Sequence, residues 1–291
     1  MLAVSLISTK KSVGKTTVAA NLDAFVADAG LRVLLLDLDT QPTLSSYYEL
    51  THRAQGGIYE LLAFNERNLA CLVSRTVVNN PDVVLSNDEH HQLNTLMLRA
   101  PNGRLRLRNL MPTFQPYYDL VVIDTQDARS VLLEMDLLAS QLAVSLVTPE
   151  ILAARQLRRD TLQLIEKIEP YSKLGIELPV LQLLINRAPA VSSNSRLILQ
   201  TLRLIFQDQT RIQVLDTELP AIEAFPRAAT CGMPVHWVEY RPPFGRVAPV
   251  EFGNIRSLAN ELFPQWLQRF SAVTGRPPLP LDTRRPHGER T

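Results

Sequence analysis

Short apolar segments alternate with segments of helical periodicity along most of the chain. The apolar segments lie near Leu2, Val33, Val83, Leu120, Leu142 and Leu181. The helical patterns fall near residues 16–29, 56–74, 104–115, 130–139, 150–168 and 192–206. Apolar strands separated by helices are typical of a parallel sheet that is buried on both faces. We therefore predict an α/β fold, a mainly parallel twisted sheet with helices on both faces, which binds its ligands at the carboxyl ends of the strands.

A loop with a glycine and a lysine lies between the first apolar segment and the first helical pattern. Residues 9–17 read Thr-Lys-Lys-Ser-Val-Gly-Lys-Thr-Thr. A strand, such a loop and a helix in this order form a phosphate-binding loop, because the free N–H groups and the dipole of the helix N-terminus attract anions. Gly14 lets the backbone approach a phosphate, Lys15 can reach the β and γ oxygens, and Thr16 can bind Mg²⁺. The predicted ligand is a nucleoside triphosphate with Mg²⁺.

Carboxylates stand at the ends of two further apolar segments. The segment that starts at Val33 ends in Asp37 and Asp39, which the alternation of a strand would place on the same side. The segment that starts at Leu120 ends in Asp124. This is the form of a Walker B motif, in which an aspartate holds Mg²⁺ through water. We expect these acids to face the phosphates, although aspartates after strands also serve as ordinary turn residues or helix caps.

Together these motifs resemble the deviant Walker A family of ParA and MinD ATPases, whose loop reads K-G-G-x-G-K-[ST]. Lys10 lies five residues before Lys15 and matches the signature lysine of that loop. Lys11 and Ser12 stand where the family has two glycines, and Thr40 replaces a proline in the segment that is similar to D-x-D-P-Q. The resemblance therefore implies an ATP site with an altered loop.

The resemblance also implies a role for each side chain. The expected catalytic residues stabilise the transferred charge or orient the attacking water, and they are Lys10, Lys15 and Asp39. The expected Mg²⁺ ligands are Thr16, Asp37 and Asp124. The expected nucleotide contacts are Lys11, Ser12, Val13, Gly14, Lys15, Thr16, Thr17 and Asn186. Asn186 would pair with the adenine edge, although an asparagine after a strand is also a common turn residue.

The likeness extends from Leu2 to about Phe270 and is closest to the ParA-like proteins of integrative and conjugative elements, on residues 34–48 and 148–155. We predict an ATPase domain at residues 1–274 and a disordered tail, rich in proline and arginine, at residues 275–291. The MinD branch ends in a basic amphipathic helix that binds membranes. Prolines in the tail exclude such a helix, so the resemblance favours the branch that acts on nucleic acid.

Composition limits the class of protein and its partners. The 291 residues are 46% hydrophobic and 20% charged, which suits a globular α/β enzyme. We expect a cytoplasmic protein, since the first strand has no basic leader and no apolar run is long enough to span a membrane. The net charge of +1 means that DNA binding requires a local basic patch. The family binds DNA nonspecifically through basic residues in its C-terminal part, and the candidates here are Arg227, Arg241, Arg246 and Arg256.

The leading hypothesis is a ParA-type ATPase that partitions or maintains a DNA element. In this hypothesis ATP closes a homodimer in which Lys10 reaches the phosphates of the other subunit. The dimer holds DNA nonspecifically at the nucleoid, and a ParB-like centromere-binding protein stimulates hydrolysis. A non-hydrolysing interaction protein is the alternative that Lys11 and Ser12 indicate. A third, weaker alternative is another enzyme of the same superfamily, such as dethiobiotin synthetase or the nitrogenase iron protein. The iron protein requires cysteines that bind an iron–sulfur cluster, and Cys71 and Cys231 do not resemble them.

Overall fold

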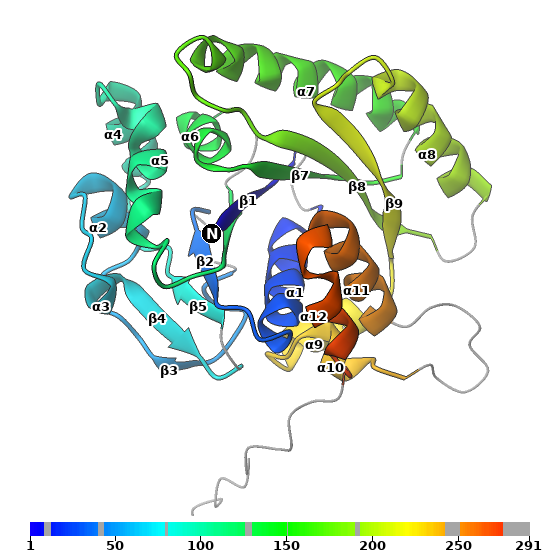
Figure 1. Ribbon diagram of the computed structural model, residues 1–291, viewed down its shortest axis with the longest axis horizontal. Helices are drawn as coiled ribbons and strands as arrows, with labels where there is room; N and C mark the ends of the chain where they lie inside the picture. The colour runs from blue at the N-terminus through cyan, green and yellow to red at the C-terminus, as the bar shows by residue number, and fades with distance from the viewer. Residues whose placement is uncertain are drawn as a thin grey trace, which may run out of the picture.

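In the part of the chain that the structure describes, nine strands form one sheet in the order β3-β4-β5-β2-β6-β1-β7-β8-β9 (Figure 1). The structure is a computed structural model, and it describes residues 1–8, 13–39, 44–78, 81–125, 130–149, 151–189, 193–241 and 251–275. The parallel strands are β1 (Leu2–Ile7), β2 (Val33–Asp37), β5 (Pro81–Val84), β6 (Leu120–Asp124), β7 (Leu142–Val147), β8 (Val180–Ala188) and β9 (Ile212–Pro220). The antiparallel strands are β3 (Leu50–His52) and β4 (Val73–Thr76), which form one edge.

The central strands are buried on both faces. Every residue of β2, β6 and β7 is buried, and these segments are rich in valine, leucine and isoleucine, which suit strands covered on both sides. The apolar segments of the sequence therefore became the middle of the sheet, and the polar residues that follow them lie at its carboxyl edge.

One face of the sheet is covered by α1 (Lys15–Asp28) and by helices from the end of the chain. These helices are α9 (Ala224–Thr230), α10 (Val235–Val238), α11 (Glu251–Leu262) and α12 (Leu267–Ala272). Val18, Leu22 and Phe25 of α1 are at most 1% exposed, because α1 lies between the sheet and α11 (Figure 1). The buried residues of α1 run without interruption from Val18 to Ala27 and so lie on all sides of the helix, as its interior position requires.

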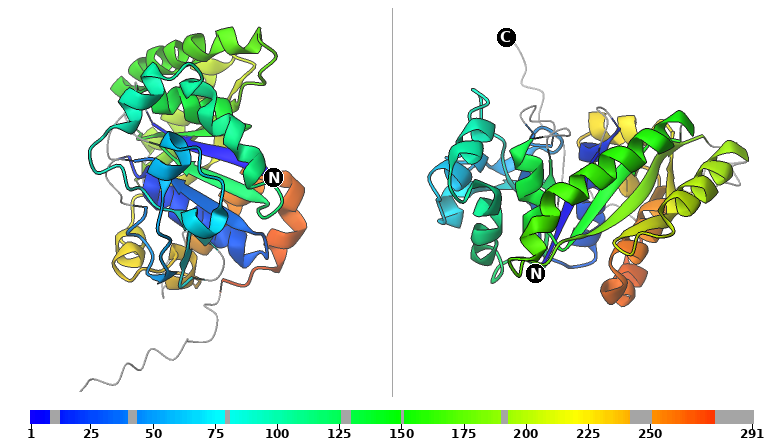
Figure 2. Two further views of the ribbon diagram at one scale, coloured as in Figure 1. Left: turned by 90° about the vertical axis from the view of Figure 1, so that its left-hand side faces the viewer. Right: turned by 90° about the horizontal axis from the view of Figure 1, so that it is seen from above.

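The other face carries the remaining helices (Figure 2). They are α2 (Ile58–Ala63), α3 (Leu69–Leu72), α4 (Leu93–Arg99), α5 (Arg106–Leu110), α6 (Val131–Ala139), α7 (Ile151–Ser172) and α8 (Ser193–Phe206), with short 3₁₀ turns η1 (Gly103–Leu105) and η2 (Met111–Thr113) beside α5. A further turn, η3 (Pro264–Trp266), precedes α12. The predicted fold class, a mainly parallel sheet with helices on both faces, is confirmed.

Two predicted helices were wrong in extent. The pattern over residues 56–74 is divided into α2, α3 and the start of β4. Asn65 adopts a left-handed backbone with φ 59, which ends a helix and which asparagine tolerates better than most residues. The pattern over residues 104–115 is η1, α5 and η2, since Pro112 lacks the N–H that a continuous helix needs.

Strand β9 and the edge strands β3 and β4 were not predicted. All three are only partly buried, so they lack the continuous apolar run that marks the central strands. The tail from residue 276 lies outside the described residues, and the division of the chain at residue 274 stays a prediction. Among the described residues, no helix combines the length and apolarity that a membrane crossing requires.

Candidate nucleotide and magnesium site

The structure describes the phosphate-binding loop from Val13 onward. Gly14 has φ 92 and ψ 25, the left-handed region, and it immediately precedes the first residue of α1. A Cβ atom built on Gly14 would lie 2.8 Å from Nδ2 of Asn186. Both the backbone angle and the close approach therefore require glycine here. Lys10, Lys11 and Ser12 lie outside the described residues.

The Asn186 side chain forms a hydrogen bond to the backbone of the phosphate-binding loop. It lies near the end of β8, is 6% exposed, and donates a hydrogen bond from Nδ2 to the carbonyl oxygen of Val13 at 2.7 Å. In this structure the side chain therefore positions the loop. The predicted contact between Asn186 and adenine stays a prediction.

Lys15 begins α1 and is 7% exposed. Its Nζ donates a hydrogen bond to Oγ of Ser8 at 3.3 Å, just beyond the end of β1. An ammonium group at the junction of β1 and α1 lies beside the free N–H groups of the helix N-terminus, which is where phosphate oxygens bind in such loops. The side chain is thus ordered at the predicted place.

Asp124 and Thr16 meet across the carboxyl edge of the sheet. The Thr16 hydroxyl donates a hydrogen bond to Oδ2 of Asp124 at 2.6 Å, although 108 residues separate them. Asp124 is fully buried, and its Oδ1 has no hydrogen-bond partner among the described residues. A buried carboxylate oxygen without a partner, next to a threonine hydroxyl, fits the oxygen ligands that Mg²⁺ prefers.

Asp37 ends β2 directly beside Asp124, its register partner on β6. Its Oδ2 accepts hydrogen bonds from the backbone N–H of Ser45 at 2.8 Å and from the Ser45 hydroxyl at 2.6 Å. Its Oδ1 accepts a hydrogen bond from the N–H of Asp39 at 3.3 Å. Because β2 ends at Asp37, strand alternation does not determine the direction of Asp39, and its place beside the phosphates stays a prediction.

Two serines that the sequence analysis missed form hydrogen bonds with Asp37 and Asp39. The Ser45 hydroxyl also accepts a hydrogen bond from the N–H of Ser86 at 3.0 Å, and the Ser86 hydroxyl donates to the carbonyl of Asp39 at 2.6 Å. Ser45 and Ser86 therefore connect Asp37 and Asp39 to the chain after β5. Their spacing follows no motif, so only the fold reveals them.

Burial raises the pKa values of both Asp37 and Asp124. Burial raises the pKa of Asp37 from 3.8 to about 7, and hydrogen bonds from Ser45 offset part of that rise. Burial, followed by the charge of Asp37, raises the pKa of Asp124 from 3.8 to about 8, against the opposing effects of Thr16 and Lys15. A divalent cation at this edge would favour the ionised carboxylates by its own charge.

Comparison with known proteins gives the family of this chain. The AAA_31 family, an AAA domain, matches residues 1–177, which contain the loop and all three acids. The chain belongs to this family. It is 24% identical over 235 residues to Soj, the sporulation initiation inhibitor protein of Bacillus subtilis, with 80% of this chain and 89% of Soj covered. It is 30% identical over 177 residues to pGP5-D, the virulence plasmid ParA family protein of Chlamydia trachomatis, with 59% of this chain and 66% of pGP5-D covered.

A solved structure shows the same fold. The ATP complex of a McdA variant from Cyanothece superposes with a TM-score of 0.70 at 19% identity, covering 96% of this chain and 98% of McdA. The predicted resemblance to ParA and MinD-type deviant Walker A ATPases is thereby confirmed, and AAA_31 proteins of this kind are P-loop ATPases.

Helix α6 carries a further buried acid that the sequence analysis did not single out. Asp136 on α6 is fully buried, and neither carboxyl oxygen has a hydrogen-bond partner among the described residues. Burial, and then the charge of Asp124, raise the pKa of Asp136 well above its usual value. The Asp136 carboxyl group therefore holds its proton more readily than an exposed aspartate does.

The candidate DNA-binding arginines lie at the C-terminal end of the chain. Arg227 on α9 and Arg241 after α10 are exposed, Arg256 on α11 is partly buried, and Arg246 lies outside the described residues. Helices α9, α10 and α11 pack together, so the three described arginines come from neighbouring elements. Their role in DNA binding stays a prediction.

Proposed function

We propose that this protein is a ParA-type ATPase that partitions or maintains a DNA element. The observation that carries the proposal is the contact between Thr16 and Asp124, with Asp37 beside it and Lys15 at the start of the same helix. A threonine hydroxyl and paired carboxylates next to a phosphate-binding lysine form a magnesium nucleotide site.

Each residue of the site has a task in ATP hydrolysis. Lys15 holds the transferred phosphoryl oxygens, and Thr16 with Asp124 holds Mg²⁺, with Asp37 supporting its water shell. When bound, Mg²⁺ neutralises charge on the β- and γ-phosphates. By the family resemblance, Asp39 orients the attacking water. The backbone that carries this side chain is held at its carbonyl by Ser86 and at its N–H by Asp37. Catalysis then rests on positioning and electrostatic stabilisation.

The wider cycle follows the family. ATP closes a homodimer in which Lys10 reaches the phosphates of the other subunit, and this dimer holds DNA nonspecifically in the cytoplasm, at the nucleoid. A ParB-like partner then stimulates hydrolysis and resets the dimer. The similarity to Soj and to the plasmid ParA protein pGP5-D supports this proposal, and the likeness of residues 34–48 to proteins of integrative and conjugative elements indicates the kind of DNA served.

The test is release of phosphate from ATP with and without Mg²⁺, in the presence of DNA. We expect Mg²⁺-dependent turnover by the wild type and its loss in Lys15→Ala and Asp39→Ala. Lys173→Ala and Asp208→Ala make the same changes at exposed positions outside the site and are expected to keep turnover. ATP binding without turnover in the wild type would instead support the non-hydrolysing alternative that Lys11 and Ser12 suggest.

A further inference from the structure

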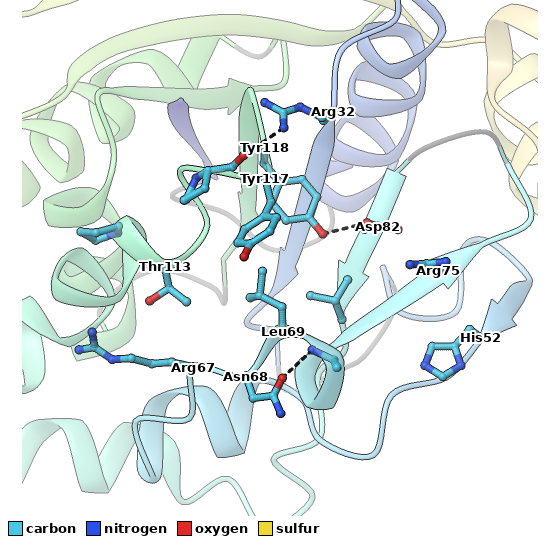
Figure 3. Close-up of a pocket in the computed structure, with 14 residues that line it drawn as sticks. Arg32, His52, Arg67, Asn68, Leu69, Arg75, Asp82, Thr113, Tyr117 and Tyr118 are labelled. Atoms are coloured by element: carbon cyan, nitrogen blue, oxygen red, sulfur yellow. Dashed lines mark hydrogen bonds between the residues drawn. The ribbon is translucent and has the colours of Figure 1, made fainter.

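A second cavity lies at the opposite edge of the sheet from the ATP site (Figure 3). It has a volume of about 1200 Å³. Arg32 precedes β2, Asp82 is the second residue of β5 and Tyr118 lies before β6, so the cavity opens at the amino ends of parallel strands. The acids of the ATP site end β2 and β6. Four residue steps along β2 separate its two ends by roughly 13 Å, so the cavity is distinct from the ATP site.

Arginines stand on opposite sides of this cavity. Arg67 and Arg75 are both exposed, and neither forms an ion pair within the part of the chain that the structure describes. His52 on β3 is the register partner of Arg75 and lies beside it in the lining. Arg32, by contrast, is neutralised by Asp119 at 2.9 Å. Asp82 also lines the cavity, is the register partner of Arg75 on β5, and interacts electrostatically with it. The cavity therefore offers an anion Arg67 on one side and, on the other, Arg75 beside Asp82 and His52.

Local hydrogen bonds hold the turn that carries Arg67. The Glu66 carboxylate accepts hydrogen bonds from the N–H groups of Arg67 and Asn68, both at 2.8 Å. The Asn68 side chain accepts from the N–H of Ala70 at 3.1 Å and caps the start of α3. These bonds satisfy the backbone groups of the turn, so the Arg67 side chain is presented to the cavity from a fixed base.

Aromatic and apolar groups line the space between the two arginines. Tyr118 is only 8% exposed, and its hydroxyl donates to Oδ2 of Asp82 at 2.8 Å, so its ring is a fixed wall. Tyr117 is 57% exposed. Figure 3 shows the two tyrosine rings and Leu69 directed into the space between Arg67 and Arg75. An exposed tyrosine flanked by arginines suits a ligand that is both planar and anionic.

We propose that this cavity binds nucleotide units, with a base against Tyr117 and phosphates at Arg67 and Arg75. Inorganic anions alone would leave the Tyr117 ring unused, whereas each nucleotide unit carries both a planar base and an anionic phosphate. The volume of about 1200 Å³ exceeds the 300–1,000 Å³ or so of typical small-ligand sites. The cavity therefore has room for more than one nucleotide, whether as a free dinucleotide or as part of a single strand. This binding requires neither ATP nor Mg²⁺.

The experiment measures binding of a fluorescein-labelled eight-residue oligothymidylate by anisotropy, at low salt without Mg²⁺. It uses the full chain with Lys15→Ala, which disables the ATP site. We expect Tyr117→Ala to weaken binding about 5- to 150-fold, the range for loss of one base stack. We expect Arg67→Ala with Arg75→Ala to reduce the slope of log K against log salt by about 1.4, or about 0.7 for each lost phosphate contact. Phe64→Ala and Arg99→Ala change an exposed aromatic and an exposed arginine outside the cavity and are expected to stay within about twofold of the parent.

Competition identifies the source of the nucleotide. Displacement of the probe by a free dinucleotide would show that single small ligands suffice, whereas displacement only by unlabelled oligonucleotide would identify a strand as the ligand. The proposal is overturned if the probe does not bind, if the cavity variants bind like the controls, or if polyglutamate displaces the probe as well as the oligonucleotide does. Urea denaturation of each variant verifies that these exposed substitutions leave the fold intact.

Discussion

The two buried acids of the ATP site predict an unusual dependence of stability on pH. In the folded protein the pKa of Asp124 is raised to about 8 from 3.8. Between these values the folded protein holds a proton that the unfolded chain has released. The contribution of Asp124 to the free energy of unfolding is therefore fully present below the unfolded pKa and falls as the pH rises through this range, with a slope of about 1.4 kcal/mol per pH unit for one proton.

The substitution Asp124→Asn removes this proton and keeps an oxygen that can accept the Thr16 hydroxyl. From pH 5 to pH 7 the wild type is expected to lose about 3 kcal/mol more stability than Asp124→Asn, the product of two pH units and the slope for one proton. Acids remote from Asp124 are common to both proteins, so their effects on the slope cancel in the comparison. Asp37 and Asp136 interact with Asp124, and the measured difference in slope includes the change in their titration.

The assay is urea denaturation at pH 5, 6 and 7 in buffer that contains a chelator. Asp208→Asn, at an exposed position, is expected to follow the wild type. Addition of Mg²⁺ should then stabilise the wild type more at pH 7 than at pH 5, since protons compete with the metal for Asp124. Parallel curves for wild type and Asp124→Asn would refute the reasoning, because Asp124 would then hold no extra proton in the folded state.

Other substitutions test the glycine of the phosphate-binding loop, the hydrogen bond between Ser45 and Asp37, and the contacts of Glu261 with strand β9. Gly14→Ala is expected to lower the free energy of unfolding and nucleotide affinity by more than Gly30→Ala, since both residues have positive φ but only Gly14 lacks room for a Cβ; urea denaturation and calorimetry measure this. Ser45→Ala removes a 2.6 Å hydrogen bond to Asp37 and is expected to destabilise by about 1–3 kcal/mol in urea. Glu261→Ala leaves two N–H groups of β9 without the carboxylate that binds them at 2.6 and 2.9 Å, and hydrogen exchange of those amides should accelerate while Glu261→Gln shows a smaller effect.

The sequence predicted the parts of the site that lie at the ends of strongly apolar segments. Parallel strands bring their carboxyl ends to one edge, so Asp37 and Asp124 could be placed beside Lys15 and Thr16 without any coordinates. The fold class followed from the same alternation, because strands that are buried on both faces read as continuous apolar runs.

Contacts between distant segments could not be predicted in this way. Ser45 and Ser86 approach Asp37 only because the chain after β2 and the chain after β5 meet at the same corner. Glu261 binds β9 where the pairing of β9 with β8 is irregular, and an irregular register leaves no periodic signal. The cavity at the opposite edge likewise combines short segments, and no motif connects Arg67 with Tyr117.

Calorimetric titration of ATP, with and without Mg²⁺, tests the central claim most directly. We expect the wild type to bind ATP in a Mg²⁺-dependent way, with release of protons near pH 7 as the metal ionises Asp124 and Asp37, and we expect Lys15→Ala to bind far more weakly. The double variant Lys11→Gly with Ser12→Gly is expected to bind at least as tightly as the wild type. Equal binding by wild type and Lys15→Ala, or binding by the double variant alone, would contradict the assignment of a working ATP site to the natural loop.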